Sequence, residues 1–284
     1  MTTSPTRAEP AALEVALKTL WGASRWPGLA DTRVVAAHPA FHEALRRLDQ
    51  LAAVQASGVV HGVHGVGKSY LLHRWSERLS PKHYRLLRVA HSSLMGSDLL
   101  RQLVQLGGKT PGSRRGDNVA VLAELWQEAA PAWPILLIEE AQDLNVAALE
   151  ELRLLTCARR DAQPPFSLLL CGDADLLPRL ELGINRALIS RLSFCLHLLR
   201  WPAEALRDYL QQRLAEVGIH SSPFEPPAET LLLQSAQGLP RTVNYLLLRA
   251  MEQAAFAGRR NVTTADVQAA LDALPWLARL QPAS

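Results

Sequence analysis

Apolar runs and helical periodicities alternate along the first two thirds of the chain. Five short apolar runs have the length of buried strands and lie next to segments with helical spacing, namely Gly58–Val60, Tyr84–Val89, Ile135–Ile138, Phe166–Cys171 and Leu192–Leu199. The segment 39–56 shows that spacing, because Phe41, Leu45 and Leu48 recur every three or four residues. This alternation predicts an α/β fold, with a parallel five-stranded sheet between layers of helices.

No strand pattern returns after Trp201. Helical spacing covers Ala203–Val217, Ala228–Gln237, Arg241–Ala257 and Thr264–Leu274, and Thr263 or Thr264 caps the last of these helices. The sequence therefore predicts an N-terminal arm at 1–38, an α/β core at 39–200, a helical domain at 201–275 and a tail at 276–284.

Composition fits a globular protein and decides little about partners. Of 284 residues, 48% are apolar and 20% charged, and the net charge of +3 permits contact with a polyanion without requiring it. Cys157, Cys171 and Cys195 lie far apart in apolar runs, which favours reduced core thiols and a cytoplasmic location. No stretch approaches the ~20 apolar residues of a membrane span, so no membrane partner is expected.

The clearest motif lies between the first predicted strand and a helix that begins near Lys68. Residues 62–69 fit the pattern G-x-x-x-x-G-K-[ST] in full, which predicts a loop that wraps the phosphates of ATP with its backbone N–H groups. Lys68 is expected to reach the β- and γ-phosphates, and the Ser69 hydroxyl to bind Mg²⁺. The predicted nucleotide-binding residues here are Gly62, Val63, His64, Gly65, Val66, Gly67, Lys68, Ser69 and Tyr70.

A second acidic motif follows the apolar run Ile135–Ile138. Glu139 is predicted to hold the Mg²⁺ shell, and Glu140 to orient or activate the water that attacks the γ-phosphate. The alternative is a solvated acidic helix start that also includes Gln142 and Asp143. The loop at 62–69 favours the catalytic interpretation.

These motifs resemble those of a known family. The chain is similar to the AAA+ ATPases grouped with the secretion ATPase ExeA and the transposition proteins TniB, TnsC and, more distantly, MuB. The likeness lies in Ala37–Leu45, the loop at 62–69, Glu139-Glu140-Ala141-Gln142, Gly172–Leu176 and Gly238-Leu239-Pro240-Arg241. It implies a P-loop NTPase core, with the C-terminal helices as a lid.

The resemblance also implies roles for three further residues. Asp173 falls at the position that senses the γ-phosphate, although capping of a helix Ala174–Leu180 is an equal alternative. Arg191 falls at the arginine finger, which reaches the nucleotide of a neighbouring subunit in a ring or helical filament, with Arg186 as its rival. Arg241 matches the lid residue that contacts the phosphates.

Two of these positions depart from the family pattern. Glu139 stands where aspartate is usual, and Asp173 stands where a neutral polar residue is usual. A carboxylate at 173 repels phosphate unless it is protonated or bound to the metal. The departures predict slow hydrolysis, with ATP binding retained.

A basic segment at Gly107–Gly116 is the best candidate for contact with double-stranded DNA. Its candidate phosphate-binding residues are Lys109, Thr110, Arg114 and Arg115, and the alternative is a solvated loop. The leading hypothesis is an ATPase that oligomerises on duplex DNA and recruits a transposase. A secretion-type assembly ATPase and a nucleotide-gated scaffold with little hydrolysis are the alternatives.

Overall fold

The computed structural model describes residues 10–28, 38–90, 96–157 and 164–278, which form two compact units. The sheet unit takes in Pro39–His64 and Lys68–Leu199. The helical unit takes in the described residues from Arg200 onward, those up to His38, and Gly65–Gly67. Residues 1–9 and 29–37 of the predicted arm, including Ala37, and residues 279–284 of the predicted tail lie outside the described part of the chain.

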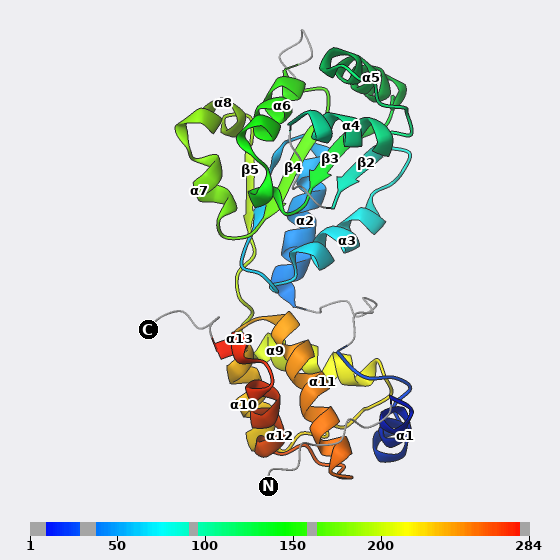
Figure 1. Ribbon diagram of the computed structural model, residues 1–284, viewed down its shortest axis with the longest axis vertical. Helices are drawn as coiled ribbons and strands as arrows, with labels where there is room; N and C mark the ends of the chain where they lie inside the picture. Colours follow the sequence, from blue (N-terminus) through cyan, green and yellow to red (C-terminus); the bar gives the residue numbers. More distant parts are fainter. Residues whose placement is uncertain (1–9, 29–37, 91–95, 158–163, 279–284) are drawn as a thin grey trace. The chain divides into compact units, whose positions relative to one another are not determined.

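The sheet unit contains five parallel strands in the order β2-β3-β4-β1-β5 (Figure 1). The strands are β1 (Gly58–His61), β2 (Tyr84–Val89), β3 (Trp133–Ile138), β4 (Ser167–Gly172) and β5 (Phe194–His197). The predicted five-stranded parallel α/β fold is therefore confirmed. Strand β5 is shorter than the apolar run Leu192–Leu199 because Leu199, 68% exposed, lies beyond the ladder.

Helices bury both faces of this sheet. They are α2 (Pro39–Ala53), α3 (Lys68–Arg78), α4 (Gly96–Leu106), α5 (Arg115–Glu128), α6 (Val146–Thr156), α7 (Leu176–Leu180) and α8 (Arg186–Ile189), with 3-10 turns η1 (Ala141–Asp143) and η2 (Gly183–Asn185). Ile138 and Leu170 belong to the core that α4, α5 and α6 complete. The alternate residues Leu137 and Leu169 are equally buried, as expected of a parallel sheet covered on both sides.

The helical unit has a core of its own. It comprises α1 (Pro10–Trp21), α9 (Ala203–Ala215), α10 (Pro226–Ala236), α11 (Pro240–Phe256), α12 (Thr264–Asp272) and α13 (Pro275–Ala278). Helix α1 is tied to it by buried Leu17 and by Trp21, whose Nε1 donates to Arg260 O at 2.8 Å. Thr263 and Asp266 form a capping box at α12, which decides between the two predicted caps.

Two expectations of the sequence need correction. Of the three cysteines, Cys171 is buried, whereas Cys157 and Cys195 are exposed. Cys157 ends a helix and Cys195 lies on an edge strand, so an apolar neighbourhood along the chain did not mean burial in space. The predicted helix Ala174–Leu180 begins only at Leu176. Within the described ranges, no helix combines the length and hydropathy needed to cross a bilayer.

Candidate functional site

Three neighbouring strands bring the predicted motifs together. In the sheet order, β3, β4 and β1 are adjacent and parallel. Their carboxyl ends therefore lie at one edge, where ligands bind in open α/β sheets. Glu139 follows β3, Asp173 follows β4, and the loop that begins at Gly62 follows β1.

The loop after β1 has the backbone that a phosphate cradle needs. Gly67 has a φ of 110°, a conformation that a side chain disfavours, and α3 begins at the next residue. The N–H groups at the start of this 11-residue helix are the donors that bind anions. Lys68 is 7% exposed, and its Nζ donates to Gly62 O at 2.7 Å and to Val63 O at 3.2 Å.

Other predicted nucleotide-binding residues flank this lysine. Ser69 is exposed on the first turn of α3, and the Tyr70 ring packs 5.4 Å from Phe41. Gly65–Gly67 belong to the helical unit by their contacts, as does Arg241 on the first turn of α11. Within that unit, the Arg241 N–H donates to Gly65 O at 3.3 Å.

Glu139 is a buried carboxylate with an arginine partner. Its residue is 5% exposed, its N–H donates to Val89 O at 2.9 Å, and Arg88 Nε donates to its Oε1 at 2.5 Å. Arg88 was not among the predicted site residues. The available signal was a charged residue between the apolar Leu87 and Val89, although Arg85 in the same strand has the same character. A guanidinium at this distance neutralises the charge that burial disfavours.

These residues fit a magnesium ion bound together with a nucleotide. Ser69 and Glu139 supply the hard oxygen ligands that Mg²⁺ prefers, and Mg²⁺ usually keeps several waters and phosphate oxygens as further ligands. The described residues hold no group of three or more His, Cys, Asp or Glu placed to bind a metal by themselves. The Arg88 guanidinium occupies one oxygen of Glu139 and so competes for that carboxylate.

Replacing Arg88 with methionine is expected to destabilise the fold by about 2 kcal/mol, because it leaves the Glu139 carboxylate buried without its donor. Urea unfolding followed by circular dichroism measures this change. The double variant Arg88→Met, Glu139→Gln is expected to recover most of the loss, since a neutral amide is cheaper to bury. An unchanged unfolding midpoint for Arg88→Met would show that the pair contributes nothing to stability.

Glu140 has an unusual backbone for a residue with a side chain. Its φ of 49° and ψ of 41° lie in the left-handed region, which is unfavourable for residues other than glycine. Residues with such strained backbones cluster at functional sites. The turn η1 follows directly. Gln142 Nε2 on that turn donates to Glu140 Oε2 at 2.8 Å. The catalytic candidate is thus held by both its backbone and a neighbouring amide.

Asp173 lies between the turn into α7 and the phosphate loop, and the N-cap of α7 is Asp175. Its Oδ1 accepts from the Asp175 N–H at 2.9 Å, which shapes the turn into α7. Its Oδ2 lies 2.9 Å from His64 Nε2 in the phosphate loop, and its own N–H donates to Gln142 Oε1 at 3.1 Å. His64 and Gln142 therefore hold this carboxylate and its backbone in place beside the phosphate loop.

An open cleft of about 750 Å³ lies beside these groups, all within the sheet unit. Its titratable lining residues are His64, Glu140, Asp143, Asp173, Asp175 and Arg179.

Two titratable side chains of the neighbouring strands, Cys171 of β4 and His61 of β1, add little charge. Burial raises the pKa of Cys171 to about 12, so it stays a neutral thiol. Burial is the largest cause that lowers the pKa of His61, and the charges of His197 and Lys68 lower it further. The His61 ring stacks on His197 with ring centroids 4.4 Å apart.

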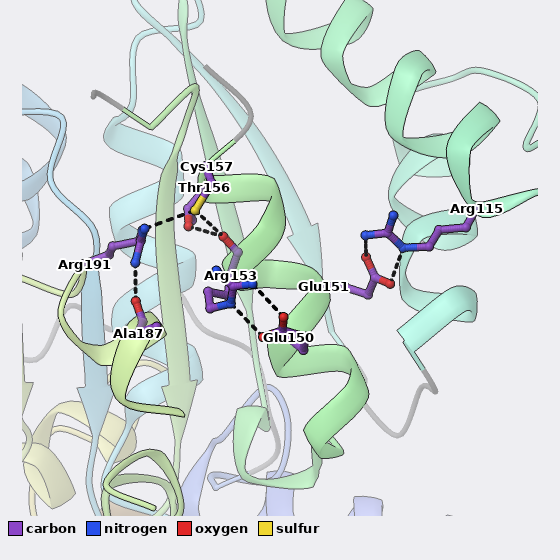
Figure 2. A network of polar contacts seen from close by, with 8 residues as sticks. All are labelled: Arg115, Glu150, Glu151, Arg153, Thr156, Cys157, Ala187 and Arg191. Atoms are coloured by element: carbon purple, nitrogen blue, oxygen red, sulfur yellow. Dashed lines mark hydrogen bonds and ion pairs between the residues drawn. The ribbon is translucent and has the colours of Figure 1, made fainter. Parts of the chain in front are cut away.

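The predicted arginine finger is bound to its own protomer. Arg191 donates through Nη1 to Ala187 O and through Nη2 to Cys157 Sγ at 3.1 Å (Figure 2). Its rival, Arg186, is exposed at the start of α8. Contact with another subunit requires Arg191 to leave these two acceptors.

The basic segment splits into a loop and the start of a helix. Arg115 is the first residue of α5 and forms a bidentate pair with Glu151, at 2.6 and 2.7 Å (Figure 2). Lys109 pairs with Glu128 at 3.0 Å. Thr110 and Arg114 are exposed, and among the described residues no acidic side chain pairs with Arg114. The positive charge here is therefore partly neutralised.

Comparison with known proteins identifies the fold. Residues 52–180 match the family model described as AAA domain. General secretion pathway protein A of Aeromonas hydrophila is 30% identical over 142 residues, which cover 50% of this chain and 26% of that protein. The chain thus matches about a quarter of the length of that curated relative.

Solved structures share the fold at low identity. The ORC1 protein of Aeropyrum pernix in complex with DNA is 20% identical and has a TM-score of 0.68, over 90% of this chain and 72% of that chain. Cdc6p of Pyrobaculum aerophilum is 17% identical with a TM-score of 0.71, over 87% and 70%. The Holliday junction branch migration motor RuvB of Thermotoga maritima is 16% identical with a TM-score of 0.57, over 84% and 70%. The fold is that of the P-loop AAA+ ATPases.

Proposed function

We propose that this chain is an AAA+ ATPase that binds ATP with Mg²⁺ in the loop Gly62–Ser69, assembles with further copies of itself, and acts on duplex DNA in transposition. The observation that carries the ATPase assignment is that Lys68 follows β1 while Glu139 and Glu140 follow β3, so that all three lie at the carboxyl edge of the sheet, on either side of β4. The AAA domain match and the fold support nucleotide hydrolysis in general.

The residues divide the hydrolytic step between them. Lys68 and the N–H groups at the start of α3 hold the phosphates, and Ser69 and Glu139 hold the divalent ion, which supplies positive charge opposite the leaving phosphates. Glu140 orients a water and accepts its proton as the water oxygen bonds to the γ-phosphorus. The bond from that phosphorus to the β–γ bridging oxygen breaks, and ADP leaves with the electron pair.

A neighbouring copy completes the site in this proposal. Arg191 leaves Cys157 and Ala187 and reaches the γ-phosphate of the next protomer in a ring or helical filament. Arg241, whose N–H contacts Gly65, couples the phosphate loop to the lid helices. Asp173, paired with His64, senses the γ-phosphate.

Duplex DNA is the proposed surface on which the copies assemble. The net charge of +3 and the basic segment at Gly107–Gly116 permit phosphate contact without base readout. The ORC1 protein of Aeropyrum pernix, which shares the fold, was solved in complex with DNA. A transposase is the proposed partner, and an integrase-like reading frame beside this one would support that part.

The test is ATP-dependent assembly on DNA. With ATP and Mg²⁺ at low salt, the wild-type protein is expected to form large species in sedimentation experiments and to shift duplex DNA. Arg114→Ala is expected to weaken the shift and to lower the slope of log affinity against log salt by about 1.

Glu151→Gln provides the matched comparison, because it releases Arg115 from its ion pair. It is expected to strengthen DNA binding, whereas Arg46→Ala, at an exposed position on α2, is expected to change nothing. A protein that neither assembles nor shifts DNA with ATP would overturn the DNA-dependent role. Equal binding by Arg114→Ala and wild type would remove only this interface.

A secretion-type assembly ATPase is a second candidate with direct support. The 30% identity to General secretion pathway protein A favours it as much as the structural neighbours favour DNA. Assembly with ATP that is indifferent to duplex DNA is the outcome that selects this candidate.

A further inference from the structure

A chain of hydrogen bonds links the phosphate loop to Glu140. From the loop, His64 Nε2 lies 2.9 Å from Asp173 Oδ2, and the Asp173 N–H donates to Gln142 Oε1 at 3.1 Å. Gln142 Nε2 then donates to Glu140 Oε2 at 2.8 Å. The Gln142 amide therefore donates to Glu140, which follows β3, and accepts from Asp173, which follows β4.

The packing around Gln142 is tight enough to fix the amide. A Cβ on Gly172, the last residue of β4, would lie 2.7 Å from Gln142 Oε1 and 2.8 Å from a methyl of Leu176. A side chain at 172 would therefore displace the amide from the Asp173 N–H. The glycine permits the close approach that seats Gln142 between β3 and β4.

We propose that Gln142 is a positioning residue for ATP hydrolysis: its amide holds Glu140 in the orientation that activates water and ties that orientation to Asp173 and His64 at the phosphate loop. The proposal rests on the ATPase function proposed above. Glu140 needs such support, because its left-handed backbone alone does not fix the direction of its carboxylate.

The donor is the part of Gln142 that matters. Gln142→Glu keeps the shape and the acceptor for the Asp173 N–H, and it replaces the Nε2 donor with a second oxygen that repels Glu140. Gln142→Ala removes the donor and the acceptor together and adds no charge.

The experiment compares kcat for phosphate release and the affinity for ATP of wild type, Gln142→Glu and Gln142→Ala at about pH 8. Both variants are expected to lose about tenfold or more in kcat. Their affinity for ATP is expected to stay within about twofold, because the hydrogen bonds of Gln142 go to Glu140 and Asp173 and not to the nucleotide loop.

Controls separate this role from folding and from the proposed function. Gln105→Glu adds the same charge to an exposed position on α4 and is expected to leave kcat unchanged. Wild-type hydrolysis together with an unaffected kcat of Gln142→Ala overturns the positioning role alone, as does a loss of ATP affinity as large as the loss of kcat. A wild-type protein that hydrolyses no ATP overturns the proposed function, and the positioning role with it.

Discussion

Replacing Glu140 with glutamine is expected to lower the rate of ATP hydrolysis by about a hundredfold or more, with ATP affinity close to that of wild type. The amide has nearly the same size and still accepts a hydrogen bond from Gln142. It lacks a basic oxygen, so it cannot take a proton from the attacking water. The αL backbone at 140 is unchanged, because the substitution keeps a side chain of the same branching.

Single-turnover phosphate release and equilibrium binding of ATP measure the two effects separately. Glu124→Gln removes one carboxylate from the exposed face of α5 and is the matched control, for which no effect on either quantity is expected. Hydrolysis by Glu140→Gln at the wild-type rate would remove Glu140 from the chemistry. A wild type that binds ATP but releases no phosphate would favour the nucleotide-gated scaffold.

The sequence predicted the sheet because its strands are short and mostly apolar, and the central strands β3 and β4 are buried along almost their whole length. Apolar runs located all five, and the glycine-rich loop placed a helix near Lys68, where α3 begins. Helix α5 was not predicted, although its Val119, Leu122 and Trp126 recur every three or four residues. Its first residue, Arg115, was consequently taken as part of a loop.

The contacts between site residues could not be predicted from the sequence. Arg88 and Glu139 come from neighbouring strands β2 and β3, and their contact depends on a register that no local pattern specifies. The same holds for His64 and Asp173, which are joined only because β1 lies next to β4. Motif spacing therefore identified most of the candidate residues, whereas the sheet order determined their partners.

Lys68 carries the other large effect. The residue is 7% exposed, and its ammonium lies against the carbonyl oxygens of Gly62 and Val63, where the loop turns. Phosphate oxygens are stronger acceptors than these carbonyls, so a bound triphosphate is expected to draw the ammonium onto itself. Loss of charge-assisted contacts to two phosphates is worth about 3 kcal/mol, or about a hundredfold in affinity.

Two further variants show whether any loss of binding is specific to this ammonium. Lys82→Ala, exposed on the turn before β2, removes the same charge outside the loop and is expected to bind ATP like wild type. Lys68→Met retains most of the aliphatic side chain, and its thermal unfolding midpoint shows whether the loop still folds.

Titration calorimetry of ATP with Mg²⁺ into wild type and Lys68→Ala tests the binding site most directly. We expect saturable binding at one site per wild-type chain, and affinity about a hundredfold weaker for a folded Lys68→Ala protein. Equal affinity of the two proteins for ATP would contradict the assignment of Gly62–Ser69 as the nucleotide site and, with it, the function proposed for this chain.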